Sequence, residues 1–173
     1  MLPKLTFVLG GAGSGKSLWA ENLLLSSHLE PVYIATSRVF DDEMNAKIAI
    51  HKSRRNENWR TIEADLELSD ALNGLGATQA VLIDCATMWL SNHMLDRSNL
   101  REARDRLIGA LGTCDAPVVI VSNEVGQGIV PENALARAFR EAQGTLNIEL
   151  AKAADLAVLV TAGLPQVLKG QLP

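Results

Sequence analysis

A glycine-rich stretch near the start of the chain has the residue types and spacing of a phosphate-binding loop. Residues 10–17 read GGAGSGKS and satisfy the pattern G-x-x-x-x-G-K-[ST]. The glycines let backbone N–H groups turn inward around phosphate oxygens, and the helix expected after the loop adds the positive end of its dipole. The predicted phosphate contacts are Gly10, Gly11, Ala12, Gly13, Ser14, Gly15, Lys16 and Ser17.

Two side chains of this loop have a chemical task in the prediction. Lys16 supplies a point charge for the β and γ phosphates of a nucleotide, which makes it a candidate catalytic residue. The Ser17 hydroxyl is a candidate ligand for Mg²⁺. The alternative is a glycine turn that only packs a strand against a helix. A Lys-Ser pair after the last glycine has no packing reason, so the sequence favours phosphate binding.

A magnesium ion bound to nucleotide phosphates usually has a second protein anchor at the end of an apolar strand. Asp84 follows the apolar run Val81, Leu82, Ile83 and fits that position. The alternative is a carboxylate that caps the next helix. We expect Ser17 and Asp84 to hold Mg²⁺ together with the phosphates.

Among the three histidines, His51 stands out by its neighbours. Met44, Ile48 and His51 fall at i, i+4 and i+7, which places them on one face of a helix expected over residues 41–54. The cations at 52, 54 and 55 disfavour a charged imidazole, and a neutral imidazole is a nucleophile that can attack phosphorus. The alternative is a solvated helix face. We expect His28 in a solvated loop and His93 on a helix surface.

Short apolar runs alternate with longer segments of helical spacing along the chain. Buried strands are expected at residues 5–9, 31–35, 80–83, 117–121 and 156–160, and helices at 16–27, 41–54, 66–75, 99–111 and 132–154. This alternation predicts an α/β protein with the three-layer, RecA-like fold of P-loop NTPases and a mostly parallel central sheet. Residues 122–131 form a glycine-containing loop, and the apolar tail from 163 to 173 is an edge strand or an oligomer contact.

Length and composition place the chain among ordinary globular proteins. The 173 residues suffice for one domain, 1–173, with a core that needs neither disulfides nor a structural metal. A net charge of -4 argues against a general nucleic-acid-binding surface. We expect no transmembrane segment, no export signal and a cytoplasmic location, in which a disulfide between Cys85 and Cys114 is not expected.

Several blocks, in order along nearly the whole chain, resemble one known family. They are GGAGSGKS at 10–17, YIATS at 33–37, DDEM at 41–44 with the following I-x-x-H-K-x-x-R, WRTIE at 59–63, LIDCATMWLSN at 82–92, SNEVGQGIVPENALAR at 122–137 and AGLP at 162–165. The chain is similar in these blocks to the bifunctional adenosylcobinamide kinases/adenosylcobinamide-phosphate guanylyltransferases of cobalamin biosynthesis.

The resemblance implies two reactions. A nucleoside triphosphate, ATP or GTP, phosphorylates the aminopropanol hydroxyl of adenosylcobinamide, and GTP then gives GMP to that phosphate, with pyrophosphate leaving. In the family the second step passes through a GMP-histidine intermediate, and the matching residue is His51. The implied cofactor is Mg²⁺. The family also implies a homo-oligomer, such as a trimer.

Carried over position by position, the family's nucleotide contacts extend beyond the phosphate loop. They match Thr36, Ser37, Arg38, Lys52, Ser53, Arg54, Arg55, Glu63 and Asp84. The acids among them serve guanine, ribose or Mg²⁺, and the sequence does not distinguish these roles. The chain departs from the family at Gly13, where an arginine is common. Some relatives perform only the transfer step, so the kinase step is an expectation. Two other functions stay open: a plain P-loop small-molecule kinase, which would have no use for His51, and a nucleotide-gated binding module.

Overall fold

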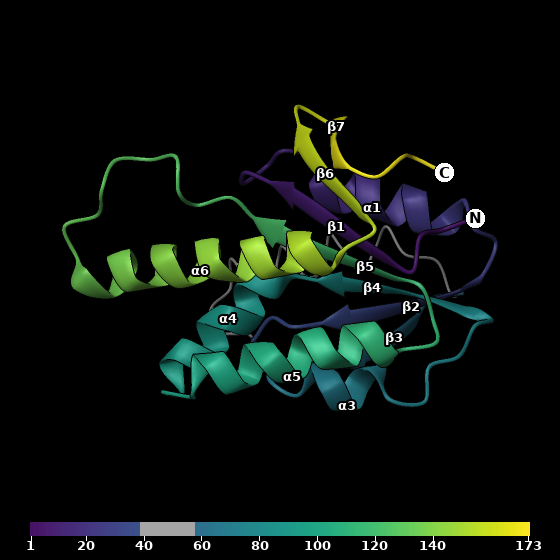
Figure 1. The fold of residues 1–173 in the computed structure, drawn as a ribbon, viewed down its shortest axis with the longest axis horizontal. Coiled ribbons are helices and arrows are strands. Elements are labelled where there is room, and N and C mark those ends of the chain that lie inside the picture. The colour runs from purple at the N-terminus through teal and green to yellow at the C-terminus, as the bar shows by residue number, and fades with distance from the viewer. Residues whose placement is uncertain (39–57) are drawn as a thin grey trace.

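The computed structural model describes residues 1–38 and 58–173, and its regular elements follow one another as strands and helices of an α/β protein (Figure 1). The strands are β1 (Leu5–Gly10), β2 (Glu30–Ala35), β3 (Arg60–Glu63), β4 (Gln79–Asp84), β5 (Val118–Asn123), β6 (Leu156–Thr161) and β7 (Leu164–Lys169). The helices are α1 (Lys16–Leu25), α3 (Leu68–Leu72), α4 (Ala86–Leu95), α5 (Leu100–Thr113) and α6 (Ala134–Ala153).

In the described residues the strands form one sheet with the order β3-β2-β4-β5-β1-β6-β7. Strands β1 to β6 pair in parallel, and only the hairpin of β6 and β7 is antiparallel. The central strands are apolar throughout because both of their faces are covered: Val81, Leu82 and Ile83 in β4 have no exposed surface. This confirms the predicted α/β class with a mostly parallel sheet.

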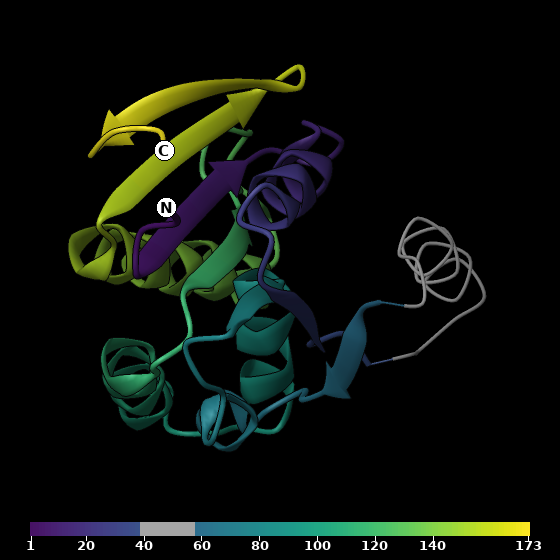
Figure 2. The same ribbon diagram turned by 90° about the vertical axis from the view of Figure 1, so that its right-hand side faces the viewer.

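Two hydrophobic clusters, one on each face of the sheet, make up the core. One cluster joins the sheet to α3, α4, α5 and α6, through residues such as Leu68, Leu107 and Leu150. The other joins it to α1 through Ala20 and Leu24. Figure 2 shows α1 on the side of the sheet opposite α5 and α6. The three layers that the sequence predicts are therefore present.

The structure also adds elements that the sequence did not predict. The five predicted strands are found as β1, β2, β4, β5 and β6, and the tail forms the edge strand β7. Strand β3 and the bounds of helix α4 are additional, because the sequence implied a helix after Asp84 and around His93 but gave no range for it. Helix α3 is shorter than the expected helix at 66–75. The helix expected at 41–54 lies outside the described residues. None of the helices in residues 1–38 and 58–173 is long and apolar enough to cross a membrane.

Candidate active site

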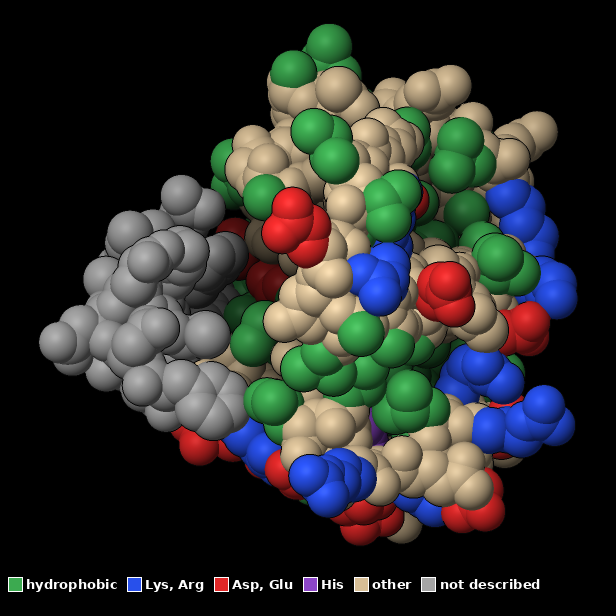
Figure 3. All heavy atoms as spheres, turned by 90° about the vertical axis from the view of Figure 1, so that its left-hand side faces the viewer, with side chains coloured by type: hydrophobic (Ala, Val, Ile, Leu, Met, Phe, Trp, Pro, Cys, Tyr) green, Lys and Arg blue, Asp and Glu red, His purple; other side chains and the backbone are tan. Residues whose placement is uncertain are grey.

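The carboxyl ends of the parallel strands bring the predicted site residues to one edge of the sheet. Strand register places Gly10 beside Asn123, and Ala35 beside both Asp84 and Glu63. In open α/β sheets ligands bind outside this edge. Figure 3 looks onto it and shows charged side chains of both signs among hydrophobic ones. The phosphate loop and the predicted acids therefore share one face of the molecule.

The phosphate loop has the backbone shape that its glycines permit. Gly13 and Gly15 adopt φ angles of 68° and 88°, a left-handed conformation that favours glycine. Gly15 is the N-cap of α1, so the loop ends where the positive end of the helix dipole begins. The Ser14 carbonyl accepts a 2.8 Å hydrogen bond from Gly163 N in the β6–β7 turn. The loop is thus held from both the sheet and the hairpin.

Lys16 lies over the loop. Its Nζ donates to the Gly11 carbonyl oxygen at 3.1 Å, and the residue is only 9% exposed. This position places the ammonium group inside the loop that would surround the phosphates. A phosphate oxygen of a nucleotide can replace the Gly11 carbonyl oxygen as its hydrogen-bond acceptor. The position suits the predicted role of Lys16.

Asp84 ends β4 two strands away from β1, and the peptide bond that follows it is cis. Burial, followed by the charge of Asp84, raises the pKa of the Cys85 thiol to about 11, while Lys16 lowers it. Because that thiol is protonated at neutral pH, Cys85 is not a nucleophile.

The donor atoms of Ser17 and Asp84 fit a magnesium ion. Both are oxygen donors, and Mg²⁺ typically takes one or two protein ligands while nucleotide phosphates and water complete its shell. Among the described residues no group of three or more His, Cys, Asp or Glu is placed to hold a metal ion. Two oxygen donors suit an ion whose remaining ligands come from the nucleotide and from water.

Two predicted nucleotide contacts after β2 have protein partners in this structure. The Thr36 hydroxyl is fully buried; it donates to the Cys85 carbonyl oxygen at 2.8 Å and accepts from Cys85 N at 2.7 Å. It joins the end of β2 to the end of β4. Ser37 is half-buried, and its predicted contact stays a prediction.

Arg38 forms a fork with two carboxylates. Its Nη1 and Nη2 donate to Asp96 at 2.8 and 2.7 Å, and its Nε donates to Asp65 at 2.5 Å. Asp96, and then Asp65, raise the pKa of Arg38, and Arg38 lowers the pKa of Asp96. A nucleotide contact of Arg38 would have to replace part of this arrangement.

The remaining predicted residues divide into two groups. Glu63 is exposed at the end of the edge strand β3, on the same edge as Asp84. The candidate nucleophile His51 and its neighbours Lys52, Ser53, Arg54 and Arg55 lie outside the described residues.

A buried polar network at the end of β5 escaped the sequence analysis. The Ser122 hydroxyl donates to Asn147 Oδ1 at 2.7 Å and accepts from Gln143 Nε2 at 3.0 Å. Thr87 Oγ1 accepts from Asn123 N at 2.8 Å, and Asn147 Nδ2 donates to the Asn123 carbonyl at 3.2 Å. The sequence did contain one indication of this network: Gln143 and Asn147 are four residues apart and so lie on the same face of α6 as the buried Leu146 and Leu150.

His93 corrects an expectation. The sequence predicted a place on a helix surface, but the residue is 3% exposed and packs edge-on against Trp89 with ring centroids 4.5 Å apart. Its Nε2 lies 3.3 Å from the Leu66 carbonyl oxygen. The reason is that α4 is covered by other elements of its layer. His28, by contrast, is exposed, as predicted.

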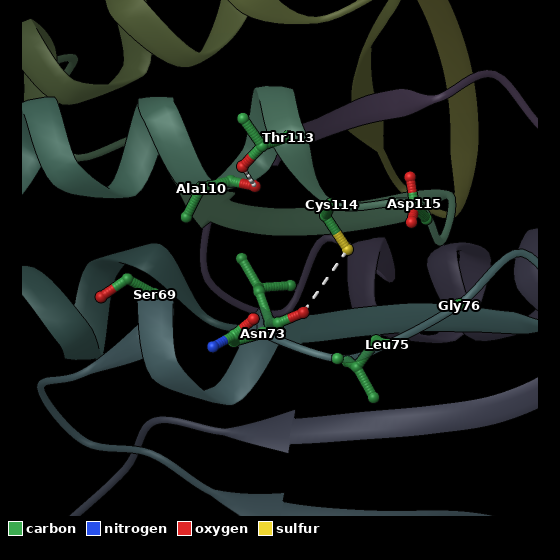
Figure 4. A pocket seen from close by; sticks show the side chains of 10 residues that line it. Ser69, Asn73, Leu75, Gly76, Ala110, Thr113, Cys114 and Asp115 are labelled. Atoms are coloured by element: carbon green, nitrogen blue, oxygen red, sulfur yellow. Dashed lines mark hydrogen bonds between the residues drawn. The ribbon is translucent and has the colours of Figure 1, made fainter.

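A pocket of about 340 Å³ lies at the opposite edge of the sheet (Figure 4). Its walls include Leu75 and Gly76 before β4 and Cys114 and Asp115 before β5, and Cys114 Sγ donates to the Leu72 carbonyl oxygen at 3.8 Å. These residues precede the strands, whereas the phosphate loop follows one. The pocket is therefore separate from the nucleotide site.

Fold and loop together define the class of the protein: an α/β nucleotide-binding protein of the P-loop type. A solved RadB recombinase has a similar fold, with a TM-score of 0.52, 18% identity, and coverage of 91% of this chain and 74% of that one. This likeness concerns the fold alone.

Sequence comparison gives the family. The model of the family described as "Cobinamide kinase / cobinamide phosphate guanyltransferase" matches residues 6–168. The bifunctional adenosylcobalamin biosynthesis protein CobP of Pseudomonas aeruginosa is 40% identical, covering 95% of this chain and 96% of its own. CobU of Salmonella typhimurium is 42% identical, covering 91% and 95%. The chain belongs to this family, and it is a transferase of cobalamin biosynthesis, as its motifs predicted.

Proposed function

We propose that this protein phosphorylates adenosylcobinamide with ATP or GTP and then transfers GMP from GTP to adenosylcobinamide phosphate, giving adenosylcobinamide-GDP. The observation that carries the proposal is the match of the family over nearly the whole chain, together with a phosphate loop and acids on one edge of the sheet. Both reactions need a fixed triphosphate, and this edge supplies the amides that fix it.

The proposed division of labour follows the geometry of the loop. Amides of residues 10–17 and the Lys16 ammonium hold and neutralise the phosphates. Ser17 and Asp84 are the residues that would hold Mg²⁺, which, when bound, neutralises developing charge on phosphate oxygens. For the kinase step the loop presents the γ phosphate to the hydroxyl of adenosylcobinamide.

For the transfer step we assign the nucleophile to His51. A nitrogen of its neutral imidazole attacks the α phosphorus, the bond from that phosphorus to the α–β bridging oxygen breaks, and pyrophosphate leaves. A phosphate oxygen of adenosylcobinamide phosphate then attacks the same phosphorus, and the phosphorus–nitrogen bond breaks. This assignment rests on the family resemblance around I-x-x-H-K-x-x-R.

Labelling with GTP that carries the isotope at the α phosphate tests the assignment. After denaturing electrophoresis, wild type should retain acid-labile label and His51→Ala should retain none, while His28→Ala, at an exposed loop position, serves as the control. Equal label on wild type and His51→Ala would refute the covalent step. A plain kinase would keep its phosphorylating activity after His51→Ala and would never retain label.

We further propose that the protein acts as a homo-oligomer in the cytoplasm, where nucleoside triphosphates are made. Strand β7 supports an assembly because its six residues are all exposed and include Leu164, Val167 and Leu168. A sedimentation mass of a single chain would contradict the oligomer.

A further inference from the structure

Glu124 is a carboxylate beside the phosphate loop that takes no part in the proposed phosphate and magnesium contacts. It follows directly after β5, the strand that pairs with β1, and its backbone N donates to the Gly10 carbonyl oxygen at 3.0 Å. The first residue of the phosphate loop and Glu124 are thus joined by one hydrogen bond. The residue is half-buried.

The other acids that the structure describes at this edge lie farther from the loop. Neighbouring strands are about 4.8 Å apart, so Asp84 on β4 lies roughly 10 Å from β1 and Glu63 on β3 roughly 19 Å. Asp84 is also the proposed magnesium ligand, and Asp65 is held by Arg38. Among the residues that the structure describes, Glu124 is therefore the acid at a strand end closest to β1 and its phosphate loop.

The carboxylate of Glu124 has one oxygen engaged and one available. Oε1 accepts a short hydrogen bond from Gly126 N, while Oε2 has no hydrogen-bond partner among the described residues. A carboxylate repels phosphate oxygens but accepts a hydrogen bond from a hydroxyl. Its chemistry therefore suits the alcohol that receives the phosphoryl group.

Glu124 stands on a rigid support. Hydrogen bonds among Ser122, Gln143 and Asn147 fix the end of β5 to helix α6. Arg140 of α6 donates to the carbonyl oxygens of Gly126 and Gly128, and so holds the loop that follows. Acid–base groups work best when their geometry is fixed in this way before the substrate binds.

We propose that Glu124 is the general base of the kinase step, an inference that rests on the proposed function. Its carboxylate takes the proton of the adenosylcobinamide hydroxyl as that oxygen forms a bond to the γ phosphorus. The bond between the γ phosphorus and the β–γ bridging oxygen breaks, the nucleoside diphosphate leaves, and the proton passes from Glu124 to solvent. The guanylyl transfer needs no such base, because its acceptor is already an anionic phosphate.

The variant Glu124→Gln separates catalysis from structure. A glutamine keeps an oxygen that can accept from Gly126 N, so the loop is preserved, but it cannot take a proton at neutral pH. The two half-reactions are measured separately, with adenosylcobinamide and ATP for the kinase and with adenosylcobinamide phosphate and GTP for the transfer. The control is Glu132→Gln, an exposed glutamate at the far end of the same loop.

We expect Glu124→Gln to lose about 10² to 10⁴-fold in kcat of the kinase step, as loss of a general base does, and to keep the transfer rate and the urea unfolding curve of wild type. A Glu124→Gln kinase as fast as wild type would overturn the inference, and so would an equal loss in both half-reactions. If wild type phosphorylates no adenosylcobinamide, the proposed kinase function fails as well. If wild type does phosphorylate it, a failure concerns Glu124 alone.

Discussion

Single residues at the strand ends show how burial decides which groups react. Cys85 directly follows Asp84 at the site, but burial and the neighbouring carboxylate keep its thiol protonated. Cys114, near the opposite edge, also has its pKa raised by burial. Lys16, by contrast, is buried, and its ammonium group donates a hydrogen bond to the Gly11 carbonyl oxygen, which a phosphate oxygen can replace. Chemistry at this edge therefore depends on oxygen and nitrogen groups rather than on thiols.

His93 makes stability depend on pH. Burial lowers its pKa from the usual 6.5, so below that pH the unfolded chain binds a proton more readily than the folded one. The folded protein therefore holds the ring neutral above pH 6.5, and stability is lost as the pH falls through and below this value. We expect the free energy of unfolding of wild type to decrease more than that of His93→Gln between pH 8 and 5. Urea unfolding curves recorded at several pH values in this range measure both proteins. Parallel curves for the two proteins would contradict this.

At the scale of elements, the turn from β1 into α1 depends on Gly15. A Cβ at this position would lie 3.0 Å from Gly163 Cα, and φ is 88°. We expect Gly15→Ala to lower the free energy of unfolding by about 1–2 kcal/mol, the cost of a left-handed alanine, and to weaken nucleotide binding.

Gly109→Ala is the matched control for Gly15→Ala. It lies within α5 with open space around it, so it should raise the free energy of unfolding by about 0.5–1 kcal/mol. Urea unfolding and nucleotide titration measure both variants. Equal effects of the two substitutions would contradict the account of the loop.

The Ser122 network joins α6 to the end of β5. Ser122→Ala leaves Gln143 Nε2 and Asn147 Oδ1 without one of their partners inside the protein, at a cost of about 1–3 kcal/mol in the free energy of unfolding. Ser26→Ala, whose hydroxyl donates to the Leu23 carbonyl at an exposed position, should stay within about 0.5 kcal/mol of wild type. Urea unfolding compares them, and similar losses would show that the network adds nothing.

The elements differ in how well the sequence predicts them, for physical reasons. Strand β5 begins with the unbroken apolar run Val118 to Val121 because both faces are covered there, and such a run is easy to identify. The sequence implied a helix after Asp84 but did not define the bounds of α4, because its buried face includes the polar Thr87, Asn92 and His93, which weaken the amphipathic pattern. Strand β3 has only Ile62 partly buried, so it has no apolar run. Tertiary contacts rather than local pattern define both elements.

The candidate site divides in the same way. The phosphate loop and Asp84 are visible in the sequence because their function depends on neighbours along the chain. The Ser122–Asn147 and Glu124–Gly10 hydrogen bonds join residues that are far apart in the sequence, and no periodic pattern predicts them. His51 was identified from its neighbours and from the family resemblance, and its role stays a prediction.

For the whole molecule, the order of strands explains how one edge can serve two reactions. Strand β1 lies between β5 and β6, so the phosphate loop has the end of β5 on one side and the β6–β7 turn on the other. The Gly10–Glu124 and Ser14–Gly163 hydrogen bonds fix both sides. A triphosphate held in one place can then be attacked at its γ or its α phosphorus, depending on which nucleophile is present.

The most direct test of this account is mass spectrometry of the products formed from adenosylcobinamide, GTP and Mg²⁺. The account predicts adenosylcobinamide phosphate with GDP, followed by adenosylcobinamide-GDP with pyrophosphate, and neither corrinoid product when Mg²⁺ is removed by a chelator. Binding of GTP with no phosphorylated or guanylylated corrinoid would contradict it.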